Sequence, residues 1–77
     1  MTKQKTVYQM IEAERAYQDA KWGQQDHTPV AWIPILLEEV GEVARAVNEN
    51  DVAEYIDELI QVAAVAVAMV ESYRRNA

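Results

Sequence analysis

Two groups of acidic residues in the second half of the chain have the spacing of a single helical face. The first group is Glu38, Glu39 and Glu42, and the second is Glu54 and Asp57. Because each residue of an α-helix turns by about 100°, residues three and four positions apart share one face. Like charges at these spacings destabilise a helix unless a cation neutralises them. The two groups therefore predict a site for a hard divalent cation.

The ligand types favour Mg²⁺, with Mn²⁺ as the alternative. Carboxylate oxygens suit both ions, and Mg²⁺ characteristically keeps waters and takes substrate phosphate oxygens into its shell. The chain has no cysteine, and its single histidine, His27, is not part of a Glu-x-x-His pair. The sequence therefore argues against zinc and di-iron sites.

An ordinary solvated surface explains the same acidic residues without a cation. Surface carboxylates are common on helices, and Glu42 can pair with Arg45 three positions later. Glu54 has the position of the carboxylate in a capping box, and acidic side chains favour helix N-termini in any case. Both interpretations stay open if the acidic residues are considered alone.

Three helices are expected to position these residues. Gly23 follows the first helix, Thr28 caps the second with Pro29 at its first position, and Asp51 caps the third. Pro34 predicts either a kink in the second helix or a short turn that ends near Ile33. The expected helices span residues 6–22, 29–47 and 52–73. If the second and third run antiparallel, the two acidic groups can face each other.

The apolar pattern predicts an all-α fold that a single copy does not complete. One face of the second helix is apolar and is expected to form core, at Ile33, Leu36, Leu37, Val40, Val43, Ala44 and Val47. The third helix is apolar around most of its circumference, which a chain of 77 residues cannot bury alone. We expect one domain over residues 1–77: a three-helix chain with antiparallel second and third helices that completes a helical bundle by homo-oligomerisation, as a dimer or tetramer.

Composition excludes several classes of partner. The net charge of -6 argues against nucleic-acid binding, which depends on Lys and Arg at phosphates. The longest apolar run, Leu59 to Val70, is shorter than the ~20 residues of a membrane helix. The segment Met1–Lys5 lacks the apolar run of a signal peptide, and the chain has no cysteine. We expect a cytoplasmic protein without a membrane partner.

The acidic groups also resemble a known family. The segments LEEVGEVA at 37–44 and EYIDELI at 54–60 are similar to the EExxE…ExxD signature of the MazG-like all-α nucleotide pyrophosphohydrolases. The resemblance implies Mg²⁺-dependent hydrolysis of a nucleoside triphosphate to the monophosphate and pyrophosphate, as in house-cleaning of the nucleotide pool. The metal ligands that it implies are Glu39, Glu42, Glu54 and Asp57.

Two further acidic residues have roles that the resemblance suggests without fixing. Glu38 holds a second ion or orients the attacking water, and it is our candidate for the catalytic group that takes the proton of that water. Glu58 lies on the same stripe as Asp57 and competes with it for the ligand position.

The first part of the chain supplies the candidate substrate contacts. Residues 14–32 resemble the leader of small MazG-like proteins of phages and bacteria. Lys21 and Arg45 are candidates for phosphate binding, and Trp22 and Trp32 for stacking on the base. Each has a structural alternative, because Arg45 can pair within its helix and the tryptophans can pack the loop onto the bundle.

The chain also departs from the family pattern. The connection between Glu42 and Glu54 is short, and the chain ends soon after the third helix, where larger members have a fourth. We expect a second subunit to replace the missing part. The alternative function is a non-catalytic helical oligomerisation or interaction module with a vestigial cation site.

Overall fold

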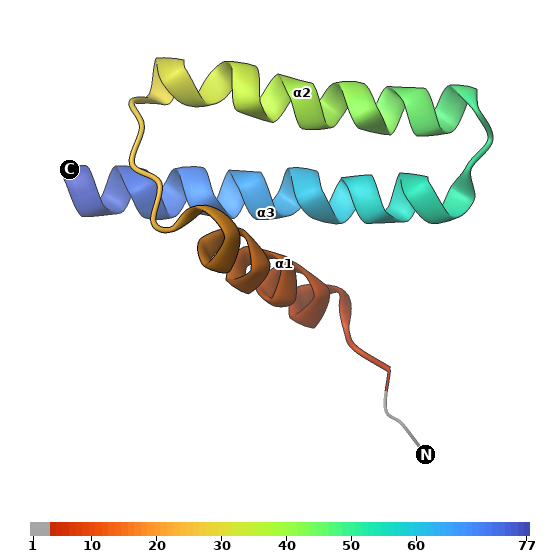
Figure 1. The fold of residues 1–77 in the computed structure, drawn as a ribbon, viewed down its shortest axis with the longest axis horizontal. Coiled ribbons are helices and arrows are strands. Elements are labelled where there is room, and N and C mark those ends of the chain that lie inside the picture. Colours follow the sequence, from red (N-terminus) through yellow and green to blue (C-terminus); the bar gives the residue numbers. More distant parts are fainter. Residues whose placement is uncertain (1–3) are drawn as a thin grey trace.

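The described part of the chain, residues 4–77 of the computed structural model, is helical and contains no strand. The three helices are α1 (Val7–Trp22), α2 (Pro29–Asn48) and α3 (Val52–Asn76). Figure 1 shows α3 returning alongside α2 after the Glu49–Asp51 connection, while α1 crosses α3. The all-α prediction is confirmed for these residues. Part of the Met1–Lys5 segment considered above lies outside them.

The helix starts follow from the side chains that cap them. The hydroxyl of Thr28 accepts a hydrogen bond from the Ala31 N–H at 3.2 Å, and Asp51 Oδ1 accepts from the Glu54 N–H at 3.0 Å. Both residues therefore cap as predicted. The backbone N–H of Asp51 donates instead to the Ala46 carbonyl at 3.0 Å. Because that donor is already paired, the carboxylate of Glu54 is not needed to close a capping box.

Pro34 does not interrupt α2. The helix is continuous from Pro29 to Asn48, so the short turn ending near Ile33 is wrong. A proline inside a helix removes one backbone hydrogen bond to the residue four positions earlier. That residue is Val30, which is highly exposed, so water can reach the carbonyl that Pro34 leaves free.

α3 is the central element of the fold. Both α1 and α2 pack against α3, whereas α1 and α2 do not pack against each other (Figure 1). The core lies between α2 and α3, where Trp32, Val65 and Ala68 are buried. α1 contributes no buried residue. One ion pair joins it to α3, in which Arg15 binds Glu71 at 2.6 Å.

The apolar stripe predicted as the core of α2 is only partly buried. Leu36 and Val43 are half-buried, but Ile33, Leu37, Val40, Ala44 and Val47 are exposed. The side toward α3 is taken by Trp32 and Ala46, which the predicted stripe did not include. We call the exposed residues of α2, together with Ile56, Leu59, Val67 and Val70 of α3, the open apolar face.

None of the three described helices is both long enough and apolar enough to cross a membrane.

The two tryptophans form a matched pair for a stability test. Trp32 is 2% exposed and Trp22 is 54% exposed. Trp32→Ala should lower the free energy of unfolding by about 3 to 5 kcal/mol, because it empties the core between α2 and α3. Trp22→Ala should lower it by less than about 1 kcal/mol. Urea unfolding followed by circular dichroism measures both changes, and equal losses would contradict this assignment of the core.

Candidate functional site

A cleft of 360 Å³ lies between α1 and α2 and reaches down to α3. It exists because the two outer helices pack on α3 and not on each other. Its lining comes from all three helices and from the loop after α1: Glu14, Tyr17, Gln18, Lys21, Trp22, Gln25, Trp32, Ile35, Glu38, Glu39, Gln61, Val65 and Ala68. Four of the predicted site residues are therefore brought together with Trp32: Lys21, Trp22, Glu38 and Glu39.

The most perturbed carboxyl of the chain lies near this cleft, on α3. Glu58 is only 8% exposed. Its pKa is raised to about 7, chiefly by burial and further by its contacts with the acidic groups of Glu54 and Glu39 and by their negative charges. Glu58 Oε2 is buried without a hydrogen-bond partner. A proton on this carboxyl, or a cation beside it, would lower the cost of its burial.

α1 adds a carboxyl for which no role was predicted. The pKa of Glu14 is raised by burial, and the negative charges of Glu39 and Asp57 raise it further, against the effect of Lys21. We call Glu14, Glu39, Glu54, Asp57 and Glu58 the carboxylate cluster. Glu14 could be recognised in the sequence only from the leader segment, because nothing in its spacing links it to the other acidic residues.

The carboxylate cluster fits a hard divalent cation by its chemistry. All its donors are carboxyl oxygens, which Mg²⁺ and Mn²⁺ prefer. A cation would also relieve the repulsion that raises the pKa values of Glu14 and Glu58. Among residues 4–77, no three acidic or histidine side chains stand close enough to hold an ion as they lie. Binding would therefore require changes of side-chain rotamers.

Glu42 and Arg45 lie outside the lining of the cleft. An Arg45 guanidinium nitrogen donates to Glu42 Oε2, three positions earlier on α2. This pairing is the alternative that the sequence offered for Arg45. Glu54 and Asp57 lie outside the lining as well. The metal roles of Glu39, Glu42, Glu54 and Asp57, the catalytic role of Glu38 and the substrate roles of Lys21, Trp22, Trp32 and Arg45 all stay predictions.

The aromatic residues occupy the end of the cleft nearest the loop. The Lys21 ammonium lies 4.7 Å from the centre of the Trp22 ring and 5.9 Å from that of Tyr17. The ring of Trp32 packs edge to face with His27 at 4.7 Å. Trp32 thus belongs both to the core and to the cleft wall, whereas Trp22 is exposed and has the Lys21 ammonium over its ring.

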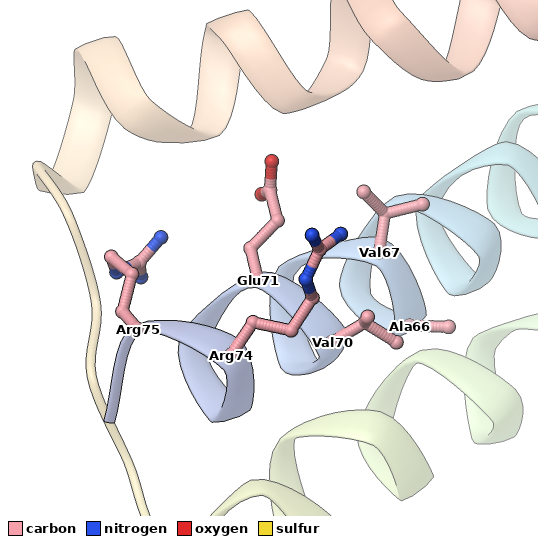
Figure 2. A pocket seen from close by; sticks show the side chains of 6 residues that line it. All are labelled: Ala66, Val67, Val70, Glu71, Arg74 and Arg75. Atoms are coloured by element: carbon pink, nitrogen blue, oxygen red, sulfur yellow. The ribbon is translucent and has the colours of Figure 1, made fainter. Parts of the chain in front are cut away.

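A larger and more open hollow lies elsewhere. It has a volume of 790 Å³ along α3 and is lined by Ala66, Val67, Val70, Glu71, Arg74 and Arg75, whose side chains Figure 2 shows. It contains no part of the carboxylate cluster. Its one carboxylate, Glu71, is already bound by Arg15. The chemistry of the chain therefore points to the smaller cleft.

Glu58 makes the stability of the metal-free protein depend on pH. Its pKa is about 7 in the folded chain, against an ordinary value of 4.5. Its protonated form is thus favoured by folding, and this stabilisation is present below pH ~4.5 and lost as pH rises through ~7. In the presence of EDTA, the free energy of unfolding measured with urea should be about 1 to 3 kcal/mol lower at pH 8.0 than at pH 5.5.

Glu58→Gln is the matched control, because the amide keeps the shape of the protonated acid and does not titrate. Its free energy of unfolding should change much less between the two pH values. An unchanged pH dependence in Glu58→Gln would show that other groups cause it.

Comparison with known proteins gives a match for the part of the chain that contains α2 and α3. The family model described as the MazG nucleotide pyrophosphohydrolase domain matches residues 27–77, about two thirds of the chain. The match covers α2 and α3 and excludes α1. Searches of curated proteins and of solved structures give no significant match. Because the match spans both acidic helices, we conclude that the chain belongs to the MazG nucleotide pyrophosphohydrolase family.

Proposed function

We propose that the protein hydrolyses a nucleoside triphosphate between the α and β phosphates, with Mg²⁺ or Mn²⁺ as cofactor. The family to which the chain belongs is one of nucleotide pyrophosphohydrolases. The observation that carries the specific proposal is the convergence of carboxyls from three helices beside a cleft that also presents Lys21 and the ring of Trp22.

In this proposal the acidic residues divide into metal ligands and a proton acceptor. Glu39, Glu54 and Asp57 hold the cation together with Glu42, once Glu42 leaves Arg45. The cation, when bound, neutralises phosphate charge and lowers the pKa of water. Glu38 lies in the cleft lining next to Glu39, where its carboxylate can accept the proton of the attacking water.

The remaining cleft residues supply substrate contacts. Lys21 is the cationic side chain of the cleft lining and is suited to a phosphate oxygen. Trp22 offers its exposed ring to the base, and Trp32 forms the wall behind it. A polyphosphate would be repelled by the bare carboxylate cluster, so substrate binding depends on the cation that reverses the local charge.

The activity test measures pyrophosphate release from a panel of canonical and modified nucleoside triphosphates. Wild-type protein should release pyrophosphate with Mg²⁺ and not with EDTA. Glu39→Gln and Asp57→Asn should each reduce the rate by at least about 100-fold. Removal of a metal ligand lowers activity more than removal of a residue that only orients a ligand.

Glu12→Gln is the control for that test, since it removes one exposed carboxylate of α1 outside the cleft. Its rate should match wild type. Absence of turnover on the whole panel would contradict the enzyme proposal and favour a non-catalytic interaction module.

We also propose that two or more copies associate through the open apolar face. The chain exposes 5936 Å², against about 4,800 Å² for a compact protein of its mass. On a helical projection, Val40 lies about 160° from the cleft-lining Glu38, and Val67 about 160° from the cleft-lining Val65. Association through this face therefore leaves the cleft open to substrate.

A single charge on the open apolar face should dissociate the oligomer. Leu37 is 59% exposed in the single chain, so Leu37→Glu should cost the folded monomer little while burying an unpaired charge in the assembly. Light scattering at micromolar concentration should give a multiple of 8.8 kDa for wild type and the monomer mass for Leu37→Glu. Tyr8→Glu, on exposed α1, should keep the wild-type mass. A monomeric wild-type protein would refute the proposal.

A further inference from the structure

The loop between α1 and α2 is fastened to the last turns of α3. Residues 23–28 form this loop, and three side chains of α3 bind it: Ser72, Arg75 and Asn76. These contacts join positions 45 to 50 residues apart in the sequence. The C-terminal end of α3 therefore determines where the loop lies.

Ser72 makes the central contact. It is fully buried, and its Oγ accepts a hydrogen bond from the His27 N–H at 3.2 Å and donates to the His27 carbonyl at 3.3 Å. One hydroxyl thus pairs both backbone groups of one loop residue. Because unpaired backbone groups in a buried position are costly, no apolar side chain can replace it without loss.

Arg75 and Asn76 bind the residues just before His27. Arg75 Nε donates to Asp26 Oδ1 at 3.0 Å, and another guanidinium nitrogen donates to the Gln25 carbonyl at 3.2 Å. The Asn76 amide also donates to Asp26 Oδ1, at 2.9 Å. These groups are exposed, so each contact stabilises the loop less than the buried contact at Ser72.

The fastened loop carries one wall of the cleft. Gln25 lines the cleft directly, and Trp22 stands immediately before the loop. The ring of His27 contacts Trp32 edge to face at 4.7 Å, so the backbone position of His27 also supports that part of the cleft wall. Ser72 does not line the cleft and acts on it only through His27.

We propose that Ser72 is a positioning residue for nucleotide binding: by holding the backbone of His27, it places Gln25, Trp22 and Trp32 to receive the nucleoside part of the substrate. This inference rests on the proposed function. It assigns a role to a side chain that touches neither substrate nor metal, at the opposite end of α3 from Glu54 and Asp57.

The test compares KM with kcat in Ser72→Ala. KM for the nucleotide should rise about threefold to tenfold, the equivalent of one hydrogen bond, while kcat stays within about twofold, because the carboxylate cluster is not disturbed. Thr6→Ala is the matched control, since it removes another hydrogen-bonding hydroxyl, at the cap of α1 far along the chain from the loop. Its KM should equal that of wild type.

A purely structural role would give a different pattern. If Ser72→Ala lowers kcat with KM unchanged, or if Thr6→Ala raises KM equally, the inference is overturned. Should Ser72→Ala fail to fold, the double variant Arg75→Gln/Asn76→Ala loosens the same loop from exposed positions. It should raise KM in the same direction, and an unchanged KM would overturn the inference.

A second readout separates this inference from the proposed function. The chain has two tryptophans, so its ¹H–¹⁵N NMR spectrum has two indole N–H signals. The signal that remains in Trp22→Phe belongs to Trp32. Without nucleotide, Ser72→Ala should shift the Trp32 signal and Thr6→Ala should not. If wild type neither hydrolyses nucleotides nor binds their α,β-imido analogues with Mg²⁺, the proposed function fails. If the Trp32 signal does not move, the positioning inference fails.

Discussion

The other features follow from one constraint: α1 and α2 both pack on α3 and do not pack on each other. It leaves a cleft between α1 and α2 that α3 closes from below. The same arrangement brings Glu14, Glu39 and Glu58 from three helices to one place. It also uses only one side of α2 and α3, so the opposite sides keep the open apolar face. A single chain therefore contains both the cleft and an exposed apolar surface.

The carboxylate cluster, to which we assign the proposed cation, makes folding less favourable. Burying Glu58 among other acids disfavours its ionised form and raises its pKa to about 7. A chain selected for stability alone would place an apolar residue at such a position, because a buried charge without a partner is costly. The cation that we propose would remove this conflict, since the groups that repel one another would then share a positive neighbour.

Polar contacts join α1 and the loop after it to α3. α1 has no buried residue, and Arg15 attaches it to α3 through Glu71 while Ser72 and Arg75 attach the loop that follows. Hydrogen bonds and ion pairs are directional, whereas apolar contacts tolerate sliding. A short chain with little core can thus still fix the angle at which α1 and its loop face the cleft.

The sequence by itself determined the three helices, two of their caps and the family, because capping, helical periodicity and the spacing of acidic motifs are local properties. It did not determine which face of α2 meets α3. Most of the predicted stripe around Leu37 is exposed, and Trp32 and Ala46 make the buried contact with α3 instead. Nor could spacing link Glu14 to Glu39, or show that Glu58 is buried. Such proximity depends on how helices distant in the chain cross, and only the tertiary structure decides it.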